Sequence, residues 1–360
     1  MTGTPEPTSH AAAAPAPAAA AEPAAASSAQ IVAPFEFTGT ARDYFGIWVF
    51  NTLLTIATLG VYSAWAKVRT QRYFHRSTRV LGASFDYRAD PGRILKGRVL
   101  VAALLLTLVV LQFYQLSFVV VATALYFLVE PWGMVRALEF RARNTSYGQL
   151  PLSFVGSMRQ AYAIRLRGAA ATLATCGLLY PRSRVQLVDF MTAGHRFGDQ
   201  RFHWSAETDD YYAVYLRAVA ITMAGGAALW AVRSLNDGVL LAPRFSGLAF
   251  YLYLLIPAAY LRAALTNLRI GKLSLGRHRF RCQIQPRRLI LLYITNFLAC
   301  LVSLGLLIPW AKVRTTRYVL SCVALLPSGA FEVQGGAAAA DPHAVGDAAG
   351  DQGLDLGLEL

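Results

Sequence analysis

Long runs without a charged residue set the strongest limit on how this 360-residue chain can fold. The longest run covers residues 99–129, which are 31 positions between Arg98 and Glu130. Residues 44–66 and 289–311 form two further runs of 23 residues each, and a helix needs about 20 apolar residues to cross a bilayer. Charged residues make up 15% of the chain, against roughly 25% in soluble domains. The pattern predicts a membrane protein.

Basic residues are concentrated in the polar segments between these runs. Residues 1–34 and 332–360 hold eight acidic residues and no Lys or Arg, so the remainder has 34 basic against 12 acidic residues, a net charge of +22. Basic loops that separate apolar runs are typical of multi-pass membrane proteins, whose Lys and Arg stay on the cytoplasmic side. This distribution excludes nucleic acid as a partner.

A nine-residue motif occurs twice, as "WAKVRTQRY" at 65–73 and "WAKVRTTRY" at 310–318. Shifting residues 51–73 by 245 positions gives 12 identities in 23 without a gap. A weaker copy, "ATCGLLYPRSRVQLVDF" at 174–190, has Arg-Ser-Arg where the others have Trp-Ala-Lys. We interpret these segments as internal repeats, with copies near 44–87, 168–204 and 289–333.

The resulting fold prediction is an all-α multi-pass membrane protein with about seven hydrophobic segments. Their order is motif segment, helical hairpin (99–129), motif segment, helical hairpin (211–232 with 245–261) and motif segment. The membrane domain covers residues 35–333, between disordered tails at 1–34 (Ala/Pro-rich) and 334–360 (acidic, Gly/Ala-rich). Alternating apolar residues after Gly turns predict short strands in the polar loops, gathered in a small sheet on one membrane face, at 81–87, 147–154, 198–204 and 328–333.

Two topologies fit these segments. In the first, seven spans alternate across the membrane. In the second, each motif segment enters and leaves on one side and breaks at Thr58-Leu59-Gly60, Thr175-Cys176-Gly177 or Ser303-Leu304-Gly305. The polar segments 67–98, 136–167, 182–210 and 262–288 carry nine, six, four and eight basic residues. The second topology is favoured because it keeps all of them, and the C-terminus, in the cytoplasm.

The strings "FTGTARDYF", "NTLLTIATLGVYSAWAKVRTQRYF" and "LGASFDY" closely resemble the YjgN family of bacterial inner-membrane proteins. The resemblance covers residues 35–333. It implies an inner-membrane location and a multi-pass fold, and it brings no defined molecular function and no catalytic residues. The middle copy departs from the family pattern because it lacks the tryptophan and the lysine.

The repeated motif supplies the main candidate site. Trp and two Arg recur at i, i+4 and i+7, a spacing that places them on one helix face. Trp prefers the membrane interface, and Arg beyond it meets lipid phosphates. The favoured interpretation is an anchoring belt; the alternative is a paired site for anionic phospholipid headgroups or a phosphorylated solute. The candidate residues are Trp65, Lys67, Arg69, Arg72, Trp310, Lys312, Arg314 and Arg317.

Three polar residues within or beside apolar runs are further candidates. Asn51 and Asn296, one in each strong copy, are expected to hydrogen-bond across helices as structural contacts. Glu130 ends the longest run in "FLVEPWGM". A carboxylate inside the membrane marks a functional site, but the following Pro131 and Trp132 favour a helix that ends at the interface with Glu130 hydrated.

The sequence contains no paired carboxylates, nucleophile elbow, phosphate loop or metal-ligand spacing, and its four cysteines lack a CxxC pair. We therefore expect no catalytic activity, metal or cofactor. Internal repeats favour transport or lipid handling, because transporters bind their substrates at repeat interfaces. The alternative is a non-catalytic structural or assembly factor of the cell envelope.

Overall fold

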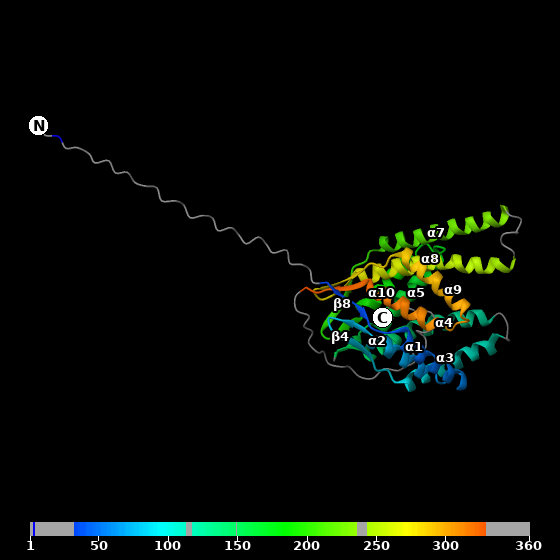
Figure 1. Ribbon diagram of the computed structural model, residues 1–360, viewed down its shortest axis with the longest axis horizontal. Coiled ribbons are helices and arrows are strands. Elements are labelled where there is room, and N and C mark those ends of the chain that lie inside the picture. Colours follow the sequence, from blue (N-terminus) through cyan, green and yellow to red (C-terminus); the bar gives the residue numbers. More distant parts are fainter. Residues whose placement is uncertain (1–2, 4–31, 113–116, 149, 236–242, 329–360) are drawn as a thin grey trace. The chain divides into compact units, whose positions relative to one another are not determined.

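The computed structural model describes residues 3, 32–112, 117–148, 150–235 and 243–328 (Figure 1). Ten helices lie in these ranges: α1 (Ala41–Ala57), α2 (Ser63–Arg76), α3 (Pro91–Gln112), α4 (Ser117–Asn144), α5 (Met158–Ala174), α6 (Tyr180–Ala193), α7 (Thr208–Leu235), α8 (Pro243–Gly271), α9 (Pro286–Val302) and α10 (Ile308–Ser321). Eleven strands accompany them: β1 (Ala33–Pro34), β2 (Glu36–Phe37), β3 (Thr78–Val80), β4 (Ala83–Tyr87), β5 (Thr145–Tyr147), β6 (Leu150–Phe154), β7 (His195–Phe197), β8 (Gln200–Trp204), β9 (Leu273–Leu275), β10 (His278–Cys282) and β11 (Val323–Leu326).

All eleven strands belong to one antiparallel sheet, in the order β1-β11-β10-β9-β8-β7-β6-β5-β4-β3-β2. Its two edge strands, β1 and β2, are consecutive in the chain and are separated by Phe35 alone. The segment therefore pairs with β11 on one side and with β3 on the other, which nearly closes the sheet into a barrel. The all-α prediction is wrong, because the polar loops form a sheet to which every described helical hairpin is attached.

The four five-residue strands share one side-chain pattern. Because alternate residues of a strand face the same side, their third and fifth positions lie on one face of the sheet. The third residues are Phe85, Leu152, Phe202 and Phe280, and the fifth residues, all buried, are Tyr87, Phe154, Trp204 and Cys282. The strands predicted within 81–87, 147–154 and 198–204 are confirmed. That at 328–333 lies almost wholly outside the described residues, and β10 was not predicted.

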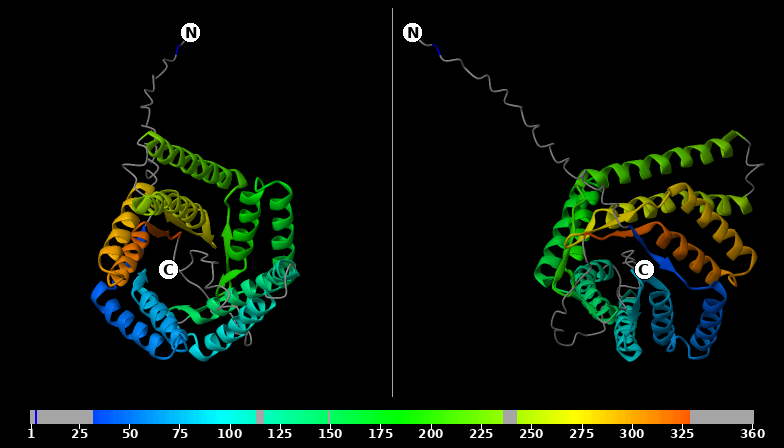
Figure 2. Two further views of the ribbon diagram at one scale, coloured as in Figure 1. Left: turned by 90° about the vertical axis from the view of Figure 1, so that its right-hand side faces the viewer. Right: turned by 60° about the vertical axis from the view of Figure 1, so that its left-hand side comes forward.

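The helices form five hairpins that leave the sheet in the same direction (Figure 1). Figure 2 shows these helices side by side around a ring, in which α10 contacts α1 as well as α9. The prediction of about seven hydrophobic segments is wrong, because each motif segment breaks into two helices. Both ends of each hairpin lie at the sheet, so seven alternating spans are also excluded.

The three short hairpins, α1–α2, α5–α6 and α9–α10, turn at the predicted triplets. Leu59, Cys176 and Leu304 have φ values of 49°, 50° and 51°, and the glycines that follow have 91°, 92° and 90°. The N–H of each glycine donates to a carbonyl five residues earlier at 2.7–2.8 Å, as in a Schellman helix end. Leu59 is 95% exposed and Leu304 93% exposed, so these hairpins present apolar tips.

The long hairpins, α3–α4 and α7–α8, extend farther from the sheet. The helices α4, α7 and α8 have 28, 28 and 29 residues, which corresponds to about 42 Å each at 1.5 Å per residue. Each contains a stretch long and apolar enough to cross a membrane, at Val120–Asn144, Thr208–Val232 and Ala249–Gly271. The exposed Leu216, Met223 and Trp230 on α7 suit contact with lipid.

Candidate functional site

Residues of the first and last short hairpins, α1–α2 and α9–α10, line two hollows of similar size. The α1–α2 hollow has a volume of about 440 Å³ and the α9–α10 hollow about 410 Å³. Eight pairs of their lining residues are 245 positions apart, which is the shift between the two strong motif copies. The pairs are Trp48/Tyr293, Asn51/Asn296, Thr55/Cys300, Ser63/Ile308, Ala66/Ala311, Lys67/Lys312, Thr70/Thr315 and Gln71/Thr316.

Both hollows are lined by cations. Lys67, Arg98 and Lys312 line the α1–α2 hollow, and Arg262 and Lys312 line the α9–α10 hollow. None of the lining residues described for either hollow is acidic. The Lys312 ammonium of α10 lies 5.0 Å from the ring centre of Phe74 on α2 and 5.9 Å from that of Tyr44 on α1. These cation–π contacts stabilise the ammonium group between the first and last hairpins.

A third hollow, the sheet cavity, has a volume of about 250 Å³ and is lined by strands and by the helix ends next to them. Lys67 and Gln71 line both this cavity and the α1–α2 hollow. Its lining residues are Phe35, Lys67, Gln71, His75, Thr78, Phe85, Tyr87, Leu138, Arg141, Ala142, Thr145, Leu152, Thr192, His195, Phe202, Arg269, Ile270, Leu273 and Phe280.

Asn51 and Asn296 each join the two helices of their own hairpin. The Asn51 amide donates to the Ala66 carbonyl at 3.4 Å, and the Asn296 amide donates to the Ala311 carbonyl at 3.3 Å. Both residues are buried. The middle hairpin makes an equivalent bond from the opposite helix, where the Ser183 hydroxyl donates to the Gly168 carbonyl at 3.2 Å.

The Trp and Arg residues that form the stripe of the motif are not among the lining residues of the two hollows. Trp65 and Trp310 follow the hairpin turns directly, and both are exposed. The Arg69 guanidinium lies 4.8 Å from the ring centre of Phe50. The Arg314 guanidinium lies 5.0 Å from the ring centre of Trp310 and donates to the Asn296 side-chain oxygen at 3.0 Å. Arg314 therefore contacts a lining residue of the α9–α10 hollow, whereas Lys67 and Lys312 line the hollows themselves.

Two arginines of the stripe connect neighbouring hairpins. Arg72 donates from Nε to the Tyr87 carbonyl at 3.1 Å, between β4 and α3. Arg317 donates to the Gly39 carbonyl at 2.8 Å, between β2 and α1. Residues 39 and 317 are 278 positions apart, so this bond ties the last hairpin to the first. Charge-assisted bonds of this kind are stronger than bonds between neutral groups.

Glu130 does not end a helix at the interface. α4 continues through Pro131 to Asn144, and the Glu130 side chain is 10% exposed. Its Oε2 accepts a hydrogen bond from Arg165 Nε at 2.8 Å, and its Oε1 lies 2.7 Å from an Arg165 terminal nitrogen. The prediction that Glu130 is a hydrated carboxylate is wrong, because Arg165 of α5 pairs with it. The two residues are 35 positions apart, and no sequence pattern pointed to this pair.

The middle hairpin keeps only part of the polar lining, with Arg184 at the position of Lys67 and Thr172 at that of Thr55. Residues 117 positions after Trp48, Thr70 and Gln71 are Arg165, Leu187 and Val188. Arg165 pairs with Glu130, while Leu187 and Val188 are buried in the core between α4, α6 and α7. Apolar packing thus occupies the two positions that correspond to Thr70 and Gln71 of the first short hairpin.

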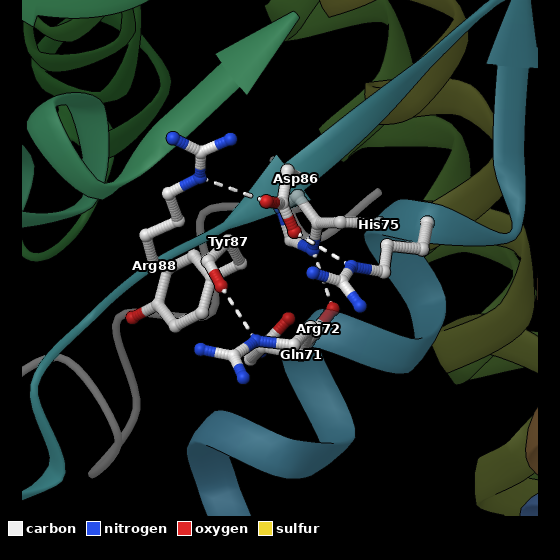
Figure 3. Close-up of polar contacts among 7 residues, drawn as sticks. Gln71, Arg72, His75, Asp86, Tyr87 and Arg88 are labelled. Carbon is white, nitrogen blue, oxygen red and sulfur yellow. Dashed lines mark hydrogen bonds and ion pairs between the residues drawn. The ribbon is translucent and has the colours of Figure 1, made fainter.

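An arginine cluster joins β4 to the end of α2 (Figure 3). His75 and Tyr87, drawn in the same view, line the sheet cavity. Asp86 accepts hydrogen bonds from Arg76 Nε and Arg88 Nε, both at 2.9 Å. The Arg76 hydrogen bond is the main reason that the pKa of Asp86 is lowered to about 2, with Arg88 assisting. In the same view His75 lies over the Gln71 carbonyl, to which its Nδ1 is 2.8 Å distant.

Several lining residues were missed from the sequence: Arg98 and Arg262, which line the hollows, and His75, Arg141, His195 and Arg269, which line the sheet cavity. These residues lie in segments counted only as basic loops. One signal was available for two of them, because Arg141 and Arg269 are 128 positions apart, the same shift that relates the middle motif copy to the last.

These features define a membrane-embedded protein with hollows between its helices. Three helices are long and apolar enough to span, their outer faces are apolar, and the basic polar segments gather at one sheet. A family model described as "Bacterial protein of unknown function (DUF898)" matches residues 32–352. The chain therefore belongs to this family.

Relatives of known location agree. The inner membrane protein YjgN of Salmonella typhimurium (strain LT2) is 25% identical over 335 residues, which cover 77% of this chain and 84% of the relative. The protein of the same name from Escherichia coli (strain K12) is 43% identical over 60 residues, 17% of this chain and 15% of the relative. No solved structure matches the chain. The predicted family is confirmed, and an inner-membrane location is supported.

Proposed function

We propose that this multi-pass inner-membrane protein handles lipid, and that the α1–α2 and α9–α10 hollows each hold the headgroup of an anionic phospholipid. The observation that carries the proposal is the set of eight lining pairs at a constant shift of 245 residues. We interpret them as one site formed twice by an internal repeat, with Lys67 and Lys312 as its cations.

The lining chemistry suits a phosphate. In the α1–α2 hollow the Lys67 ammonium, the Thr70 hydroxyl and the Gln71 amide are all hydrogen-bond donors. Donors with a positive charge bind phosphate oxygens more strongly than neutral ones. Cations that face a cavity at membrane depth are functional-site candidates. The apolar hairpin tips at Leu59 and Leu304 favour a ligand from the bilayer over a soluble one.

We propose that the sheet faces the cytoplasm. The four polar segments with nine, six, four and eight basic residues all contribute to the sheet end of the hairpins, and short basic loops stay on the cytoplasmic side. In this orientation β11, and with it the C-terminal end, is cytoplasmic. The stripe of Trp65, Arg69, Trp310 and Arg314 acts as the interfacial anchor.

The test is lipid retention by protein purified in nanodiscs that contain phosphatidylglycerol and cardiolipin, followed by native mass spectrometry. The variant Lys67→Gln/Lys312→Gln should lose the tightly held anionic lipid. The control, Arg79→Gln/Arg201→Gln, removes the same charge from exposed sheet positions and should retain the lipid. Equal retention by all three proteins would reject the headgroup site and favour a structural or assembly role.

A further inference from the structure

The sheet cavity has a chemistry of its own, different from that of the two hollows. The third residue of each five-residue strand (β4, β6, β8 and β10) lines the cavity. Phe35, which lies between β1 and β2, lines it as well. The walls are aromatic: the ring centres of Phe35 and Phe85 lie 6.4 Å apart, and so do those of Phe202 and Phe280. An apolar wall of this kind favours a hydrocarbon or aromatic group over a solvated ion.

The cavity also has a positive side. Arg141 of α4 and Arg269 of α8 line it from the sheet ends of the two long hairpins, and Lys67 of α2 lines it from a short one. No acidic residue occurs among the described residues of the lining. The planar guanidinium group of Arg matches a carboxylate with two parallel hydrogen bonds.

We infer that the sheet cavity binds a single-chain anionic amphiphile, with its carboxylate beside Arg141 and Arg269 and its chain between the aromatic walls. A volume of about 250 Å³ is slightly below the roughly 300 Å³ at which pockets for drug-sized ligands start. The cavity therefore suits one short chain and is too small for a phospholipid with two. This inference does not rest on the proposed headgroup sites, because Arg141 and Arg269 line neither hollow.

Decanoate is the probe, titrated by calorimetry into the full-length protein held in amphipol, with empty amphipol as the blank. Decanol has the same chain without the charge, and inorganic phosphate has the charge without a chain. We expect decanoate to bind and decanol to bind at least about tenfold more weakly, a difference of about 1.4 kcal/mol in binding free energy. Inorganic phosphate, which suits the two hollows and lacks a chain, should not displace bound decanoate. Equal affinities for decanoate and decanol would overturn the role of the arginines.

Variants locate the site. Arg141→Gln and Arg269→Gln should each weaken decanoate binding and leave decanol binding unchanged. Ala142→Phe, at a buried lining position, should block both; Thr145→Phe serves if the first variant does not fold. Lys312→Gln is the matched control, because Lys312 lines the hollows and not this cavity. Undiminished decanoate binding by a folded cavity-filling variant would refute the site, and loss in Lys312→Gln alone would assign the binding to the hollows.

Discussion

Replacing Glu130 by Gln tests whether this carboxylate is a structural partner of Arg165. Two contacts, of 2.8 and 2.7 Å, join the side chains, which are 10% and 25% exposed. Exposed ion pairs contribute about 0–1 kcal/mol, whereas removing one member of a buried pair costs about 3–5 kcal/mol. The partial exposure of Arg165 places the expected loss between these limits, at about 2–3 kcal/mol of unfolding free energy.

The assay is denaturant unfolding in mixed micelles of Glu130→Gln, Arg165→Gln and the double variant. If the pair is structural, the double variant loses clearly less than the sum of the single losses, because neither charge is left alone. Asp90→Asn is the control: Asp90 lies 3.8 Å from Arg93 and both are largely exposed, so its loss should stay within about 0.5 kcal/mol. Additive losses, or a Glu130→Gln variant as stable as the control, would refute the structural role.

Three further predictions follow from the sheet and the turns. The pKa of Asp86 is lowered to about 2, so its contribution to folding stability is complete above pH 3.8 and is lost as the pH falls toward 2. Asp86→Asn should lower the unfolding free energy by about 1 kcal/mol or less, because Arg76 and Arg88 are mostly exposed. The same variant should show a weaker pH dependence of acid denaturation between pH 3.8 and 2. Gly177→Ala, at φ 92° with open space around it, should cost about 1–2 kcal/mol in thermal unfolding, whereas Gly46→Ala inside α1 should cost nothing. On a background without native cysteines, Arg79→Cys and Arg201→Cys should resist an impermeant thiol reagent in intact cells; labelling there would reverse the proposed orientation.

The helix breaks were predictable because their causes are local. A Gly that follows two or three small or apolar residues can take the left-handed conformation needed to reverse the chain, and the 14-residue uncharged run at 168–181 is too short to span. The barrel was not predictable in the same way. The strands β3, β5, β7 and β9 have three residues each, too few for a periodic pattern. Near-closure of the sheet depends on residues far apart in the chain, such as Ala33 paired with Leu325.

The motif could have been divided into two faces from its spacing. At about 100° per residue, Arg69 and Arg72 stay within about 40° of Trp65. Lys67 lies about 200° away, on the side that also holds Thr70 and Gln71. Grouping Lys67 with the arginines, as one headgroup site, combined side chains that the helix separates. In the first copy, Arg69 and Arg72 are exposed, and Lys67 is partly buried and lines the α1–α2 hollow.

The middle hairpin shows which features of the motif are needed for the hairpin fold and which occur only where a hollow is present. It keeps the turn, with Cys176 and Gly177 at the same dihedral angles as in the other two short hairpins. It has Gln186 and Asp189 where the first copy has Arg69 and Arg72, and buried Leu187 and Val188 where that copy has the polar lining. A hairpin can therefore take its place in the ring without the Trp and Arg stripe and without the polar pair Thr70 and Gln71, although it keeps a cation, Arg184, at the position of Lys67. The turn is common to all three short hairpins, whereas the lysine recurs only in the first and last, the two hairpins for which we propose a headgroup site.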